Sequence, residues 1–221
     1  MPAFALSSHG KHLGRYDVVG VHASSPDRFI QHVALHIAEG REVTHGQEVD
    51  VAHMGPPLDT SGKAHAHAVG QAPLSSTEIA TVEVWIAKIE DEYLHAGAGR
   101  RKQYIVHPPW KDVRDPNRNV RRYRRYSCAG FVLDAYRQVE IYLLEIEETS
   151  LPKVDEAMLR SAYPGIGSRL TQNLGIDGDG PWRIVLAGYV VHSLNRSSEA
   201  IRTEPYQARP GDERFPPRIS P

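Results

Sequence analysis

The residues of this chain best suited to catalysis are one cysteine and a group of histidines that precede it. Cys128 is the only cysteine among the 221 residues. It lies in the segment YSCAGFV (126–132), where an apolar helical period begins. A thiol at a helix N-terminus ionises more readily, because the helix dipole and the free N–H groups favour the anion. A neighbouring imidazole would complete the working pair of cysteine hydrolases and acyltransferases.

The candidate base is His32, far upstream of the cysteine. Residues 32–37 are typical of a strand, 38–41 of a tight turn, and 42–48 of a returning strand that carries His45. Paired antiparallel strands lie about 5 Å apart, so His32 and His45 can be cross-strand neighbours. His45 would then orient the imidazole of His32, which is the role of a third triad member.

Together these segments resemble circularly permuted papain-like hydrolases, which include permuted NlpC-type peptidases and lecithin:retinol acyltransferase-like enzymes. The resemblance covers the segments DVV (17–19), HVALHI (32–37) and VTH (43–45), and the nucleophile segment 126–132. It implies a histidine base ahead of a downstream cysteine, with Asp17, Tyr126 and Ser127 near the substrate or the oxyanion. Ser127 replaces the aspartate that usually precedes the family's cysteine.

Simpler interpretations stand beside this one. A lone cysteine is often a small buried core residue, and a lone histidine is often a hydrogen-bonded core or edge residue. The histidines at 32, 36, 53, 65 and 67 suggest a metal, but no second cysteine or helical His-Glu-x-x-His completes a site. We therefore expect neither a metal nor another cofactor. The basic run 114–125 is typical of a solvated surface, and binding of an anionic substrate is its alternative use.

The predicted fold is α+β and permuted papain-like, with a small antiparallel sheet packed on the nucleophile helix. Residues 1–195 would form one catalytic domain in which 54–74 is a long loop, and 196–221 would form a proline-rich tail, extended or disordered from residue 205. Further predicted elements are a first strand at 16–22, a helix at 75–96 that opens with a capping box, a strand at 103–107, helices at 128–144 and 155–163, and a strand at 182–194.

The composition argues against nucleic-acid binding and membrane insertion. The net charge of −1 gives no reason to expect nucleic acid, and no apolar run is long enough for a transmembrane segment. The N-terminus lacks the apolar core of a secretory signal, so a cytoplasmic location is expected, with delivery by a specialised secretion route as the alternative. The oligomeric state and the organism stay open.

The sequence therefore predicts a thiol hydrolase that cleaves an amide or isopeptide bond through an acyl-enzyme. Its substrate would be a small peptide, amide or acyl compound, and the resemblance implies γ-linked or D-amino-acid peptides of cell walls, isopeptides or lipid esters. The rivals are an acyltransferase or thioesterase on acyl esters, a catalytically silent papain-like binding module, and a delivered toxin.

Overall fold

The computed structural model describes residues 10–22, 28–55, 57–99, 102–163, 175–176 and 178–215. The strands are β1 (Lys11–Leu13), β2 (Val18–His22), β3 (Ile30–His36), β4 (Arg41–Val43), β5 (Glu48–Met54), β6 (Leu58–His65), β7 (Ala68–Gly70), β8 (Trp110–Arg114), β9 (Arg121–Tyr126), β10 (Lys153–Val154) and β11 (Trp182–Arg183). The helices are α1 (Ser76–Ala96), α2 (Cys128–Arg137), the 3₁₀ helix η2 (Glu148–Ser150), α3 (Glu156–Ala162), α5 (Ala187–Ser193) and α6 (Ser198–Thr203).

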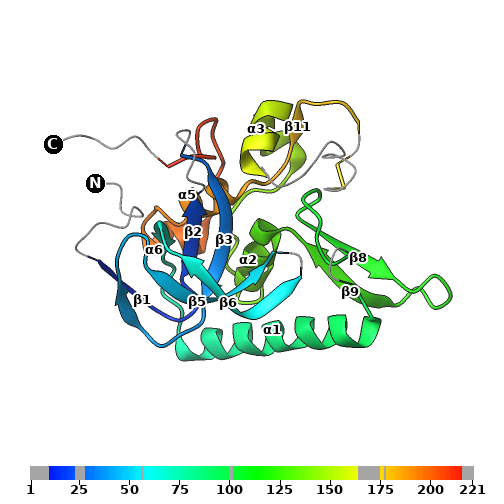
Figure 1. Cartoon of the computed structure of the whole chain (residues 1–221), viewed down its shortest axis with the longest axis horizontal. Coiled ribbons are helices and arrows are strands. Elements are labelled where there is room, and N and C mark those ends of the chain that lie inside the picture. The colour runs from blue at the N-terminus through cyan, green and yellow to red at the C-terminus, as the bar shows by residue number, and fades with distance from the viewer. Residues whose placement is uncertain are drawn as a thin grey trace.

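A five-stranded antiparallel sheet in the order β6-β5-β3-β2-β7 forms the centre of the molecule. Helices α2 and α5 pack against β3, and α1 lies along the bottom of the view beside α2 and β9 (Figure 1). The hairpin β8–β9 extends to the right of this view (Figure 1). The protein is thus a mixed α and β structure with helices packed on an antiparallel sheet.

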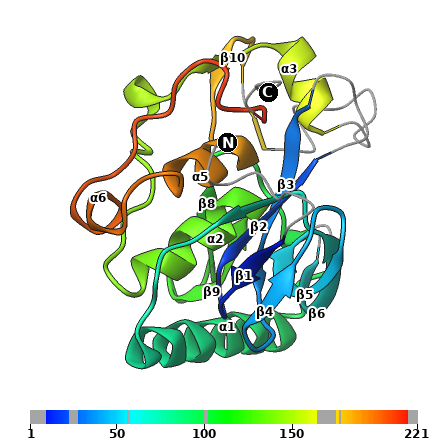
Figure 2. The same cartoon turned by 90° about the vertical axis from the view of Figure 1, so that its left-hand side faces the viewer.

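Apolar side chains are buried on both faces of this sheet. Val33 and Leu35 of β3 belong to the main core, which includes the apolar side of α2 and α5. The alternate residue Ala34 belongs to a second cluster, closed by Leu13 of β1 and Val43 of β4. The β1–β4 pair lies in front of the sheet when the molecule is turned by 90° (Figure 2).

Several predicted elements are confirmed. Strands β2 and β3 lie where alternating β-branched residues predict them, and α3 lies within 155–163. Helix α1 begins with the predicted capping box between Ser75 and Glu78, and ends at Gly97 in the left-handed conformation. Within the described residues, no helix is both long and apolar enough to cross a membrane.

The prediction of a long loop at 54–74 is wrong. Residues 58–65 form β6 and residues 68–70 form β7, one at each edge of the sheet. β6 pairs antiparallel with β5, with a register shift between Val51 and His53. Its residues are exposed or half-buried except Gly62, which explains why it lacks an apolar period.

The predicted pairing of the strands that carry His32 and His45 is also wrong. β4 pairs with β1, whereas β3 pairs with β2 and β5. The turn after β3 carries the chain out of the central sheet to β4, and β5 returns to it. His45 follows β4 and is not in a strand.

Differences also occur in the second half of the chain. Helix α2 ends at Arg137 rather than near residue 144, and the expected strand at 182–194 contains only β11 before α5 begins. At 103–107 only an isolated bridge at Tyr104 forms. In the expected tail, residues 198–203 form α6 and Phe215 is buried, so the described part is packed against the domain.

Candidate functional site

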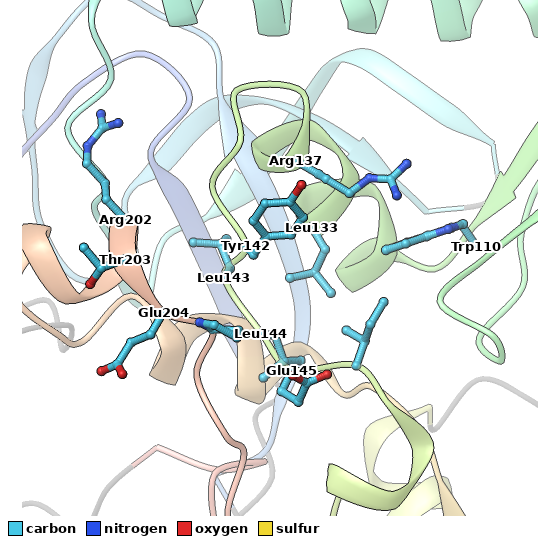
Figure 3. Close-up of a pocket in the computed structure, with 12 residues that line it drawn as sticks. Trp110, Leu133, Arg137, Tyr142, Leu143, Leu144, Glu145, Arg202, Thr203 and Glu204 are labelled. Carbon is cyan, nitrogen blue, oxygen red and sulfur yellow. The ribbon is translucent and has the colours of Figure 1, made fainter.

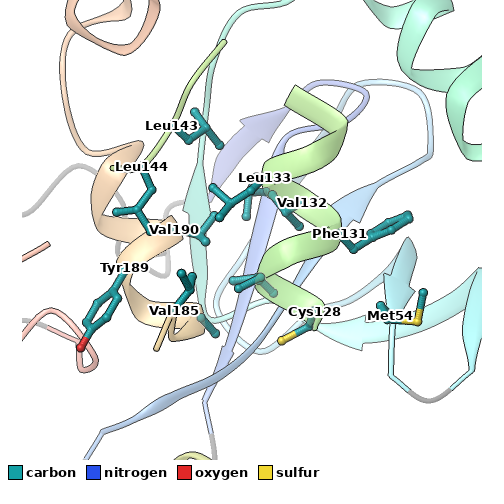
Figure 4. Close-up of a cluster of buried hydrophobic side chains, with 14 of the residues drawn as sticks. Met54, Cys128, Phe131, Val132, Leu133, Leu143, Leu144, Val185, Tyr189 and Val190 are labelled. Carbon is teal, nitrogen blue, oxygen red and sulfur yellow. The ribbon is translucent and has the colours of Figure 1, made fainter. Parts of the chain in front are cut away.

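Cys128 is the first residue of α2, as the sequence predicts. Ser127 is the N-cap, and its hydroxyl accepts a hydrogen bond from the N–H of Gly130 at 2.8 Å. The N–H of Ser127 donates to the carbonyl of Pro109 at 3.0 Å. Gly130 is required here, because a Cβ at this position would lie 1.8 Å from that carbonyl oxygen. Figure 4 shows the thiol at the end of the helix, beside the central strands.

The thiol of Cys128 lies among hydrogen-bond donors from three segments. The backbone N–H of Val33, the N–H groups of Cys128 and Ala129, and the hydroxyl of Tyr104 all interact with Sγ and favour the thiolate. Tyr104 is placed by the segment before β8, where the N–H of Ile105 donates to the carbonyl of Tyr126. The side chain of Tyr163 in turn interacts with Tyr104. Each of these donors lowers the pKa of the thiol and so acts against the effect of its burial.

The thiol lies beside a gap between β3 and β5. These strands pair only at Leu35 with Ala52 and at His36 with Val51. Toward the start of β3 the ladder stops, so the N–H of Val33 is available to the sulfur. His32 precedes Val33, which places it at the same gap.

His32 has a histidine partner from the other side of this gap. Its Nε2 lies 2.8 Å from Nδ1 of His53 on β5, and the two rings meet edge to face. Nε2 of His53 lies 3.9 Å from a carboxylate oxygen of Asp59. When His53 carries its hydrogen on Nε2 toward Asp59, Nε2 of His32 is the donor and Nδ1 of His32 keeps the lone pair of a base. Gly62 leaves room for this arrangement, since a Cβ there would lie 2.7 Å from Nε2 of His53.

The electrostatics of the gap favour neutral groups. Burial raises the pKa of the Cys128 thiol, despite the donors around it, and the side chain is 1% exposed. Burial, with a smaller contribution from His53, lowers the pKa of His32 to about 3. At neutral pH the resting site therefore holds a protonated thiol and an uncharged imidazole.

The thiol and the imidazole belong to different faces of β3. Successive side chains of a strand alternate between faces. Val33 packs in the core that contains Cys128, whereas His32 shares the face of Ala34. A direct sulfur–imidazole contact therefore requires the thiol to reach through the gap, where the ladder is open.

The structure places His53, and not His45, beside His32. The ring of His45 packs edge to face on His67, with centroids 5.0 Å apart. The sequence spacing would place His45 beside His32 only if β4 returned next to β3. β4 pairs with β1 instead. The alternating pattern of residues 48–54 could have placed His53 on a strand. Its role beside His32 could not be predicted, because it depends on which strand neighbours β3.

The other expected site residues have structural partners. Tyr126 is fully buried, and its hydroxyl donates to Asp134 at 2.6 Å. Asp17 accepts hydrogen bonds from the N–H of Gly14 and the amide of Gln71, both about 2.7–2.8 Å away. It lies near Tyr136, at the opposite end of α2 from the cysteine. The hydroxyl of Ser127 caps the N-terminus of α2.

The basic run 114–125 spans the end of β8, the turn and β9. Arg121 pairs with Glu92 of α1, and Arg124 pairs with Asp112 and with the buried Asp134. These ion pairs connect the hairpin β8–β9 to α1 and α2. The run therefore has a structural use that its position before the cysteine does not reveal.

Among the residues that the structure describes, no group of three or more His, Cys, Asp or Glu side chains could hold a metal ion. Comparisons of this chain with protein-family models, curated proteins and solved structures find no match.

Proposed function

We propose that this protein is a thiol hydrolase of permuted papain-like architecture, with Cys128 as nucleophile and His32 as base. The feature that supports the proposal is the gap between β3 and β5, with the helix-start thiol and its donors on one face of β3 and the paired imidazole of His32 on the other. His53 replaces His45 as the orienting residue. In this chain the histidine precedes the cysteine in sequence, which is the order expected of circularly permuted papain-like enzymes.

The reaction begins from the neutral pair. As a carbonyl substrate binds, the thiol proton passes to Nδ1 of His32 and the sulfur attacks the carbonyl carbon. The N–H groups of Cys128 and Ala129 stabilise the oxyanion. The imidazolium then protonates the leaving group, and water hydrolyses the thioester. The substrate class stays an amide, isopeptide or acyl ester, with water or another acceptor in the second step.

Acylation by p-nitrophenyl acetate tests this proposal. We expect acetylation of Cys128, detected by intact mass, followed by turnover, and neither in Cys128→Ala. His32→Gln should slow acylation about 100-fold or more, because the base is lost. His53→Gln should slow it less, because only the orientation of His32 is lost. His95→Gln changes an exposed histidine of α1 and should have no effect.

The second candidate is a binding module in which Cys128 is structural. The 1% exposure of the thiol and its raised pKa favour it. In that case the folded protein would not be acetylated at Cys128, or it would react equally in the parent and in His32→Gln. Either result would overturn the hydrolase proposal.

A further inference from the structure

The thiol that we propose as the nucleophile is covered in this structure. Cys128 is 1% exposed, whereas Tyr104, whose hydroxyl interacts with the sulfur, is half-buried. Tyr104 therefore contacts the buried thiol and also reaches the surface of the molecule. A carbonyl carbon must come within about 3–3.5 Å of the sulfur before attack. The side chains that cover the thiol must move before a substrate can come this close.

Two pockets of the structure lie away from the thiol. One, of about 270 Å³, lies beside the C-terminal half of α2, where Leu133 and Arg137 face Trp110 and Tyr142 (Figure 3). The other, of about 630 Å³, lies between β1 and the segment that links α5 to α6. Cys128 is not among the described residues that line either pocket. These pockets therefore do not give a substrate access to the sulfur.

The hydroxyl of Tyr104 is bonded to both groups of Cys128 that the proposed reaction uses. It accepts a hydrogen bond from the backbone N–H of Cys128 and donates one to Sγ. During attack on a carbonyl, the oxygen of the substrate would take this N–H while its carbon bonds to Sγ. The hydroxyl oxygen of Tyr104 therefore stands in the resting protein where the oxyanion would form.

Further contacts hold Tyr104 beside the thiol. A hydrogen bond joins its hydroxyl to that of Tyr163, which follows α3. The backbone is fixed on both sides of Tyr104. The N–H of Ile105 donates to the carbonyl of Tyr126 at 2.9 Å, and the N–H of Tyr126 donates to the carbonyl of Gln103 at 3.0 Å. The backbone is thus anchored to the end of β9, and the side chain can leave the thiol by rotation about its own bonds.

We propose that Tyr104 is a built-in cover of the thiol, whose hydroxyl blocks the oxyanion position until the side chain turns away from Cys128. This inference rests on the proposed function, since an oxyanion forms only if Cys128 attacks a carbonyl. The closed state protects the thiol from other electrophiles. Because opening precedes attack, the population of the open state limits the rate of acylation.

Alkylation of Cys128 by iodoacetamide tests the cover directly, with intact mass recorded from about pH 6 to about pH 10. In this profile, access to the sulfur sets the plateau rate and ionisation of the thiol sets the midpoint. Tyr104→Ala should raise the plateau about tenfold or more, because the sulfur is no longer covered. Tyr104→Phe keeps the ring and loses the hydrogen bonds that hold it, so we expect a smaller rise of about fivefold.

Tyr123→Ala is the matched control. Tyr123 is a buried tyrosine of β9 whose ring packs edge to face on Tyr93 of α1, with centroids 5.8 Å apart. Its loss also leaves a cavity, and a general loosening of the fold would accelerate alkylation in this variant too. We expect alkylation at the parent rate. Circular dichroism shows whether each variant is folded, and Tyr104→Phe keeps the test valid if Tyr104→Ala is not. Parent-like plateau rates in the folded Tyr104 variants, or an equal acceleration in Tyr123→Ala, would overturn the cover.

Acetylation by p-nitrophenyl acetate separates this inference from the hydrolase proposal. If both are right, Tyr104→Phe is acetylated faster than the parent, in step with its faster alkylation. Slower acetylation of Tyr104→Phe despite faster alkylation would make the hydroxyl an oxyanion donor and would overturn the cover. Faster alkylation of the Tyr104 variants without acetylation of any variant would keep Tyr104 as the cover of the thiol and overturn the hydrolase.

Discussion

At the scale of single residues, the thiol is subject to two opposing effects. The N–H of Val33 and the hydroxyl of Tyr104 stabilise its anion, while burial destabilises it more. The same burial keeps His32 uncharged. A helix start alone therefore does not produce a thiolate, and a substrate that displaces this environment would be needed to bring about proton transfer.

Gly130 is a position of the nucleophile segment that should not accept a side chain. In Gly130→Ala the new methyl group would overlap the carbonyl oxygen of Pro109. Relief of the overlap must move the start of α2, so we expect a loss of about 2 kcal/mol or more in the free energy of unfolding. Denaturant unfolding measures it. Gly99→Ala is the control, because nothing lies within 4 Å of its Cβ position. Equal stabilities of the two variants would contradict the close approach.

At the scale of elements, a buried carboxylate of α2 helps to hold the hairpin β8–β9. Asp134 of α2 is fully buried and accepts hydrogen bonds from Arg124 and from the hydroxyl of Tyr126. The hairpin also leads directly into α2, because β9 ends at Tyr126. The position of Cys128 thus depends on how the hairpin is anchored.

Asp134→Ala should therefore destabilise the protein by about 3 kcal/mol, because it leaves the partly buried guanidinium of Arg124 and the buried hydroxyl of Tyr126 with fewer partners. The matched control is Asp115→Ala. Asp115 pairs with Arg122 at 3.8 Å, an arginine whose side chain is half-exposed, and such pairs contribute less than about 1 kcal/mol. Thermal unfolding of both variants measures the difference. A loss in Asp134→Ala no larger than that in Asp115→Ala would show that the network does not anchor the hairpin.

At the scale of the whole molecule, the partly buried imidazole of His32 links stability to pH. Its pKa of about 3 in the folded protein lies below the ordinary value of 6.5. Well above pH 6.5 the ring is neutral in both states and contributes no pH dependence. As the pH falls from 6.5 toward 3, the unfolded chain binds a proton that the folded protein does not, so stability decreases.

We expect His32 to account for a loss on the order of 2 kcal/mol between pH 6.5 and pH 4, less than the full shift implies because the ring is partly exposed. Urea unfolding across this range should show a shallower pH dependence in His32→Gln than in the parent protein. His95→Gln removes a mostly exposed histidine and serves as the control. Parallel pH profiles for the parent and His32→Gln would show that the ring titrates normally.

The sequence by itself determined the local features. The capping box at Ser75 and Glu78 sets the start of α1, the β-branched alternation sets β2 and β3, and the apolar period after Ser127 sets the start of α2. These features depend on residues a few positions apart, and their signals lie in short windows of sequence.

Only the tertiary structure decided which strands are neighbours and, through that, the composition of the site. The pairing of β3 with β5 rather than β4 puts His53, and not His45, beside His32. Tyr104 reaches the thiol because its segment lies against the end of β9. Strand order, and the burial that sets the pKa values of Cys128 and His32, arise from contacts between segments far apart in the chain, and no local pattern specifies them.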